Sequence, residues 1–168
     1  MRFTLVDKIT RLEPGVRISA IKSVSLAEEY LADHFPKFPV LPGVLMLEAM
    51  TQTGAWLVRA SEDFAHSVVV LKEARNVKYT DFVPPGKTLE VRAEIIDGDE
   101  RETRIKAEGL IDGVTSVSAR IVLERYNLAD ADPARSPTDC LVKREMRDLF
   151  RLLYDGPLSG EVTNGQSR

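Results

Sequence analysis

The sequence has few residues of the kinds that bind metals or form cross-links. Among its 168 residues there is one cysteine, Cys140, and there are two histidines, His34 and His66. A single cysteine cannot form a disulfide within the chain, and metal sites are commonly built from several cysteines and histidines. The H-E-x-x-H spacing of zinc hydrolases and the G-x-S-x-G turn of serine hydrolases are also missing. We therefore expect no metal, and a reducing, cytoplasmic compartment.

Strong charge and long apolar runs are missing as well. The formal net charge is -3, so no basic field favours nucleic acid. No stretch stays apolar over the roughly 20 residues that span a bilayer. The segment Met1–Lys8 lacks the apolar core of a secretory signal. These absences predict a cytoplasmic protein that binds neither nucleic acid nor membrane.

The composition fits one compact domain with an α+β core. Hydrophobic residues make up 43% of the chain, enough for a substantial interior. Val44 to about Ala60 is apolar on nearly every side, which predicts a long buried helix. Leu5–Leu12 fits a short helix or an extended lead-in. β-branched or alternating residues predict strands over Val16–Val24, Ser67–Leu71, Asn76–Phe82, Thr88–Ile96, Thr103–Leu110 and Val117–Leu123. Polar turns between them predict an antiparallel meander, and wrapping it around the helix would bury that helix.

The C-terminal part has a different pattern, which divides the chain into residues 1–127 and 128–168. Leu128–Ser136 has the composition of a linker. An amphipathic helix is expected over about residues 137–155, with Ser136 as its N-cap and Pro137 in its first turn. Its apolar face carries Val142, Met146, Leu149, Phe150 and Leu153. This face could cap the sheet, extend a dimer or bind a partner, and packing on its own subunit is favoured. Residues 158–168 are expected to form a flexible tail.

Glu48 is the one carboxylate in the apolar run of the predicted central helix. If the helix buries it, its pKa rises and it can act as a general acid near neutral pH. The alternative is a helix with one polar edge that carries Glu48, Gln52 and Arg59 toward solvent. An exposed glutamate is the commoner case, so both interpretations stand at this point.

His34 precedes a stiff segment that leads into the same helix. Three prolines, Pro36, Pro39 and Pro42, fix the backbone there and remove amide donors. Histidine is the usual base at neutral pH. The predicted helix start at Gly43 and Val44 offers free N–H groups to a developing oxyanion. Together these residues could abstract a proton next to a carbonyl.

This segment also carries a family resemblance. It reads His34-Phe35-Pro36-x-x-Pro39-Val40-x-Pro42-Gly43-Val44-Leu45-x-x-Glu48-Ala49-Met50-x-Gln52. That run resembles the signature of the FabZ-type 3-hydroxyacyl-[acyl-carrier-protein] dehydratases. The likeness extends over about residues 4–125, including Lys72-x-Ala74-Arg75 and Phe82-Val83-x-Pro85-Gly86.

The resemblance implies a hot-dog fold, in which a sheet wraps a central helix, and a cofactor-free dehydratase of fatty-acid synthesis. His34 would remove the α proton of a (3R)-3-hydroxyacyl thioester, and Glu48 would protonate the departing hydroxyl. Gly43 and Val44 would bind the thioester carbonyl, and Gln52 would orient Glu48. The substrate loop would comprise Phe35, Pro36, Pro39 and Pro42.

The resemblance also implies partners. The substrate would be a thioester of acyl carrier protein or coenzyme A. The protein would be a homodimer, or a trimer of dimers, with His34 of one subunit facing Glu48 of the other.

Some alternatives remain open at the level of sequence. Asp33 stands where the family usually has glycine. The rival activities are a hot-dog acyl thioesterase and a dehydratase of a specialised lipid or polyketide pathway. A protein that binds acyl chains without catalysis is a third.

Overall fold

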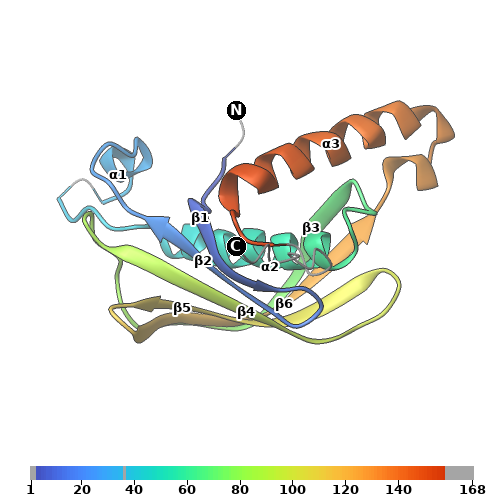
Figure 1. Ribbon diagram of the computed structural model, residues 1–168. Coiled ribbons are helices and arrows are strands. Elements are labelled where there is room, and N and C mark those ends of the chain that lie inside the picture. The colour runs from blue at the N-terminus through green and yellow to red at the C-terminus, as the bar shows by residue number, and fades with distance from the viewer. Residues whose placement is uncertain (1–2, 36, 158–168) are drawn as a thin grey trace, which may run out of the picture.

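A curled antiparallel sheet and two long helices make up the fold. The computed structural model describes residues 3–35 and 37–157. The sheet curls around helix α2 (Gly43–Ser61), and helix α3 (Ser136–Leu153) lies on the side of α2 away from the sheet (Figure 1). The expected hot-dog arrangement, a long central helix wrapped by a sheet with an extra C-terminal helix, is confirmed.

Six strands form the sheet, in the spatial order β1-β2-β4-β5-β6-β3. They are β1 (Lys8–Glu13), β2 (Arg17–Ser23), β3 (Val68–Tyr79), β4 (Thr88–Gly98), β5 (Glu102–Ile111) and β6 (Val114–Tyr126). All neighbours pair antiparallel. The predicted meander holds for β4, β5 and β6. β3 departs from it, because it pairs with β6 at the far edge of the sheet. The segment Leu5–Leu12 takes the extended alternative.

The prediction of two strands over Ser67–Leu71 and Asn76–Phe82 is wrong. One continuous strand, β3, covers most of this stretch. Its register with β6 shifts between Leu71 and Glu73 and again between Arg75 and Lys78. β3 is an edge strand and its middle is exposed, so charged residues there are compatible with a strand. The two shifts break the alternation on which the sequence argument relied.

Helix α2 is buried on the side that faces the sheet. Met46, Ala49, Met50 and Leu57 are almost inaccessible to solvent. Val44 is 70% exposed, so the helix is not apolar and buried all round, as the sequence had indicated. Gly54 lies directly against the sheet, and a Cβ atom placed there would overlap the side chain of Ile105. The lack of a side chain at this position therefore lets α2 approach β5 closely.

Helix α3 packs on its own chain through its apolar face. Phe150 and Leu153 are buried, and Met146 and Leu149 pack against the core. The Phe150 ring lies 5.9 Å from that of Trp56 and 5.4 Å from that of Phe64, centroid to centroid. Aromatic pairs of this kind add about 0.5–1.5 kcal/mol beyond the area they bury. α3 thus covers the side of α2 that the sheet leaves open, and it packs on its own chain, as favoured from the sequence.

The expected linker before α3 is structured. Two short 3₁₀ helices, η1 (Leu128–Asp130) and η2 (Pro133–Arg135), occupy it. α3 begins at Ser136 with Arg135 at the N-cap position, so the prediction of Ser136 as cap is off by one residue. Pro137 lies in the first turn, as expected. The predicted tail at residues 158–168 lies outside the described residues.

Asp139 is a buried carboxylate that joins α3 to the end of the sheet. It accepts a short hydrogen bond from the hydroxyl of Ser67, and bonds of 2.9 Å from the N–H groups of Leu128 and Ala129. Burial opposes its ionisation, but these bonds outweigh burial, and the pKa of Asp139 falls below its usual value. The start of α3 is thereby tied to the start of β3.

None of the helices formed by residues 3–35 and 37–157 combines the length and the apolar character needed to cross a membrane.

Candidate active site

His34 lies at the C-terminal end of the short helix α1 (Tyr30–Asp33). Its N–H donates to the carbonyl of Tyr30 at 3.0 Å, and its side chain is exposed. The imidazole and the Phe35 ring are 4.1 Å apart, centroid to centroid. Within the described residues the imidazole makes no hydrogen bond, so it is free to meet a substrate or another subunit.

The backbone directly after His34 is in an unusual conformation. Phe35 has φ 54°, in the left-handed region that large side chains avoid. Such a residue costs about 1–3 kcal/mol and is held only where its surroundings demand it. Pro36, the next residue of the predicted substrate loop, lies outside the described residues. The backbone next to His34, the predicted base, is therefore held in a strained conformation.

The rest of the loop is anchored before it enters α2. Val40 and Leu41 are buried, and the N–H of Leu41 donates to the carbonyl of Val83 at 2.8 Å. The rings of Phe38 and Phe82 meet edge to face at 5.3 Å. The loop is thus pinned to the β3–β4 connection, which fixes where α2 begins.

The start of α2 presents free amide groups. Pro42 occupies the N-cap position and supplies no capping side chain. Its carbonyl accepts from the N–H groups of Leu45 and Met46. In the described part of the chain, the N–H groups of Gly43 and Val44 have no hydrogen-bond acceptor. Two unpaired donors at the positive end of a 19-residue helix can bind an oxyanion.

Tyr79 is a neighbour of this helix start that the sequence argument missed. A Cβ atom at Gly43 would come within 3.1 Å of the Tyr79 ring. The ring, at the end of β3, therefore lies directly on the Gly43 backbone, and burial raises the pKa of its phenol. A glycine after Pro42 was a usable signal for close approach, but it does not say which residue approaches.

Glu48 lies one turn further along α2, and Gln52 holds it. The amide nitrogen of Gln52 donates to Glu48 Oε1 at 2.8 Å and to the carbonyl of Phe3 at 2.9 Å. The amide oxygen of Gln52 accepts from the N–H of Leu5 at 2.9 Å. Gln52 therefore fixes one oxygen of Glu48 and ties the N-terminal segment to α2.

Glu48 lies on a polar side of α2 that is partly covered. Glu48, Gln52 and Arg59 are all half-buried and follow one side of α2. This arrangement agrees with the interpretation of a polar edge on the helix. The edge is partly buried, however, and not fully open to solvent. Burial lowers the pKa of Arg59 to about 10, so its guanidinium stays protonated at neutral pH.

The single chain does not join His34 to Glu48. Among the described residues no hydrogen bond or ion pair links them, and His34 follows α1 whereas Glu48 lies within α2. The free donors of Gly43 and Val44 do share α2 with Glu48 and Gln52. One chain thus carries the free amide donors and the carboxylate on α2, while its exposed histidine lies in a separate segment.

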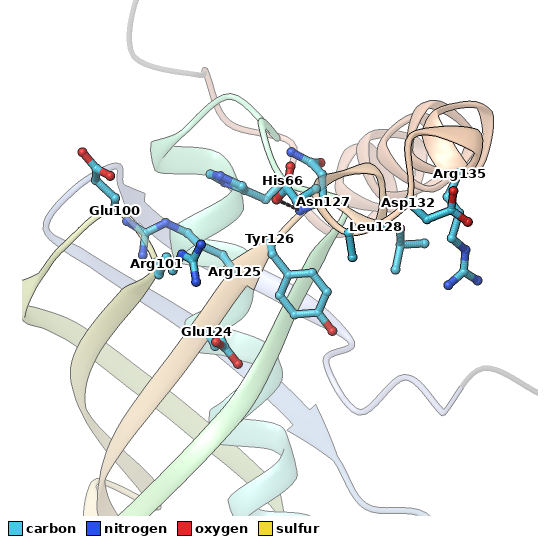
Figure 2. Close-up of a pocket in the computed structure, with 12 residues that line it drawn as sticks. His66, Glu100, Arg101, Glu124, Arg125, Tyr126, Asn127, Leu128, Asp132 and Arg135 are labelled. Carbon is cyan, nitrogen blue, oxygen red and sulfur yellow. Dashed lines mark hydrogen bonds between the residues drawn. The ribbon is translucent and has the colours of Figure 1, made fainter.

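A groove in the described part of the chain lies elsewhere. It has a volume of about 690 Å³ and lies where β6 ends and η1 begins (Figure 2). Its walls carry both signs of charge, with Arg101 and Arg135 against Glu124 and Asp132. Arg125, also in the wall, is buried and paired with Glu62 at 2.7 Å. This groove contains none of the predicted site residues, and its mixed charge favours no ligand class.

Comparison with known proteins agrees with the sequence resemblance. Residues 1–124 match the model of the FabA-like domain family. The 3-hydroxyacyl-[acyl-carrier-protein] dehydratase FabZ of Ruminiclostridium cellulolyticum is 35% identical over 119 residues, which cover 71% of this chain and 84% of that protein. The FabZ of Janthinobacterium sp. (strain Marseille) is 35% identical over 133 residues, covering 77% and 85%.

Solved structures agree on the fold. The dehydratase heterocomplex ApeI:P from Xenorhabdus doucetiae aligns with a TM-score of 0.64 at 18% identity, covering 79% of this chain and 90% of that one. The protein smu.793 from Streptococcus mutans, solved with acetyl CoA bound, aligns with a TM-score of 0.57 at 13% identity, covering 74% and 92%. At these identities the likeness is one of architecture.

Proposed function

The chain belongs to the FabA-like domain family, and we propose on that basis that it is a 3-hydroxyacyl-[acyl-carrier-protein] dehydratase of fatty-acid synthesis. The observation that carries the proposal is the start of α2. There, two free amide donors lie on the same helix as a carboxylate that Gln52 holds in place. Sequence identity of 35% to FabZ enzymes supports the same activity.

The proposed reaction removes water across two carbons next to the thioester. His34 takes the α proton of a (3R)-3-hydroxyacyl thioester, and the carbonyl oxygen gains the negative charge of an enolate. The N–H groups of Gly43 and Val44 stabilise that oxygen. Glu48, held by Gln52, gives its proton to the hydroxyl at the β carbon, which leaves as water. The product is a trans-2-enoyl thioester, and no cofactor takes part.

The separation of His34 from Glu48 supports an active site made by two copies of the chain. In the proposed homodimer, His34 meets the partner subunit's Glu48. The outer edge of β3 is a suitable contact, because within the described part of the chain this 12-residue strand pairs on one side only. Exposed Val70, Leu71 and Tyr79 line it, and free edges of this kind are usually covered. A trimer of dimers is the larger assembly to be tested.

The proposed substrates are thioesters of acyl carrier protein or coenzyme A, used in the cytoplasm. The free donors at α2 contact the thioester group, which both carriers share. They therefore favour neither carrier over the other.

The test is hydration of a trans-2-enoyl thioester, the reverse reaction, followed by loss of enone absorbance. The purified protein should be active, and His34→Ala and Glu48→Gln should each lose about 10²–10⁴-fold in rate. His66→Ala is the matched control, since His66 lies in another loop and pairs with Glu62. Thiol release without hydration would replace the dehydratase by the rival thioesterase.

The two-subunit site has its own test. Mixing His34→Ala and Glu48→Gln subunits yields heterodimers in which one site carries both intact residues. Random exchange should then restore about one quarter of parental activity, since half of the dimers regain one of their two sites. If each site lay within one subunit, mixing would restore nothing.

A further inference from the structure

Beside the proposed site, a second hollow is formed in part by the C-terminal helix. It has a volume of about 340 Å³, and lies between α2, β3, α3 and the N-terminal segment. Most of its wall is apolar: Phe3, Ala55, Trp56, Val69, Met146 and Leu149. Met146 and Leu149 belong to α3, beyond residues 1–124 that match the family. The part of the chain outside the family match therefore supplies one wall.

This hollow adjoins the proposed site at Gln52, which lines the hollow and is bonded to Glu48. The same amide that bonds Glu48 at 2.8 Å lies in the wall of the hollow. Ala55 and Trp56 follow Gln52 on the next turn of α2. The charged member of the wall, Arg59, has its guanidinium engaged, since it donates to the carbonyls of His66 and Ser67. The side chain of Arg59 also brings an apolar stem to this wall.

We propose that the hollow between α2 and α3 takes the distal end of a long acyl chain whose thioester is bound at the start of α2. The inference rests on the proposed function for the position of the thioester. It adds that Met146 and Leu149 set the longest chain that fits. An acyl tail suits this hollow because its lining is mostly apolar. The lining begins at Gln52, beside Glu48, and extends away from Glu48 along α2.

The geometry gives an expected chain length. Eight residues separate Glu48 from Trp56, which is about 12 Å along a helix that rises 1.5 Å per residue. An extended chain advances about 1.2 Å per bond, one third of the reach of a residue with three backbone bonds. About ten bonds beyond the reacting carbons therefore bring a tail to Trp56. Counted from the β carbon, the tenth bond of a dodecanoyl chain is the one to a substituent on its last carbon, so a dodecanoyl chain brominated there reaches Trp56 and a hexanoyl chain does not.

The chain offers a direct reporter of occupancy. Trp56 is the single tryptophan of the sequence and lies in the wall. The experiment titrates the whole protein with saturated bromododecanoyl-coenzyme A, brominated on its last carbon, and follows tryptophan emission. Bromine quenches tryptophan on contact, so saturable quenching is expected with this probe. Bromohexanoyl-coenzyme A should quench at least tenfold less at the same concentration.

A matched pair of variants on α3 tests the role of that helix. Leu149→Phe fills the hollow, whereas Leu152→Phe makes the same change at a position that is 80% exposed. Leu149→Phe should weaken quenching by bromododecanoyl-coenzyme A about tenfold or more, and Leu152→Phe should leave it unchanged. If Leu149→Phe does not fold, as judged by urea unfolding, Met146→Phe is the second filling variant. Equal quenching in a folded filling variant and in Leu152→Phe would overturn the proposal.

The same variants separate this inference from the dehydratase activity. The brominated probes are saturated, so their binding requires no proton transfer. Hydration of a long enoyl thioester without quenching of Trp56 would show that the hollow does not bind the acyl tail. The proposed dehydratase activity would still hold. Quenching without hydration would support the tail site and overturn the dehydratase. When both hold, Leu149→Phe should slow hydration of hexadecenoyl but not of crotonyl thioesters.

Discussion

Replacing Gly54 by alanine sets two effects of known size against each other. In a helix interior, alanine is favoured over glycine by about 1 kcal/mol. Here the new methyl group would overlap the Cδ1 atom of Ile105, and Leu123 Cδ1 would lie at 3.4 Å. Ile105 is fully buried, so its side chain has little room to turn away. Overpacking of a core costs about 1–3 kcal/mol, and we expect Gly54→Ala to lower the free energy of unfolding by about 1 kcal/mol.

A second substitution tests whether the overlap is the cause. Ile105→Val removes the Cδ1 methyl and alone should cost about 0.5–1.5 kcal/mol. In that background the alanine methyl occupies the vacated space. Gly54→Ala should then stabilise the protein by up to about 1 kcal/mol, the helix preference alone. The two changes should therefore couple by about 2 kcal/mol.

The assay is urea unfolding of the four proteins at one subunit concentration, because assembly makes stability depend on concentration. Unchanged m values would show that the comparison is between similar unfolding reactions. Equal effects of Gly54→Ala with and without Ile105→Val would refute the reasoning. The close approach of α2 to β5 would then not depend on the missing side chain.

Three further substitutions test the packing of α3 and the support of Glu48. Phe150→Ala should lower the free energy of unfolding by about 3–5 kcal/mol, measured in urea, because the ring packs on Trp56 and is 3% exposed. Asp139→Asn should destabilise at neutral pH, and the urea midpoints of parent and variant should converge in strong acid. The lowered pKa of Asp139 stabilises the fold above the unfolded value of about 3.9 and ceases to do so as pH falls through the folded pKa. Gln52→Ala removes a hydrogen bond to a carboxylate, worth about 1.5–3 kcal/mol. Gln52→Ala should therefore lower kcat about tenfold or more. An unchanged kcat would show that Gln52 does not position Glu48 for catalysis.

The sequence predicted the elements whose side chains alternate or cluster clearly. β4 is the plainest case: Leu89, Val91 and Ala93 are buried, and Arg92 and Glu94 are exposed. β3 was misjudged, because an edge strand with two register shifts has no simple period. The buried carboxylate of Asp139 also escaped notice, since its partners lie up to 72 residues away along the chain.

The candidate site was predictable in its residues and not in its arrangement. The spacing of Glu48 and Gln52 places them one helical turn apart, and the structure joins them by a hydrogen bond. Where His34 would lie could not be read from periodicity, because a loop with three prolines has none. The roles of these residues in catalysis stay predictions for the mutants described above.

The position of β3 also shapes how the chain folds as it is made. β3 precedes β4, β5 and β6, yet among residues 3–35 and 37–157 its one partner in the sheet is β6, which ends at Tyr126. α2 ends at Ser61, so about 65 residues must follow before the sheet around it can close. At a synthesis rate of about 5–20 residues per second, these residues take about 3–13 s to be made, and the sheet around α2 stays incomplete for that time. During that interval only β1 and β2, which precede α2, are available to cover it, and the remainder of its apolar face is open to nascent-chain chaperones.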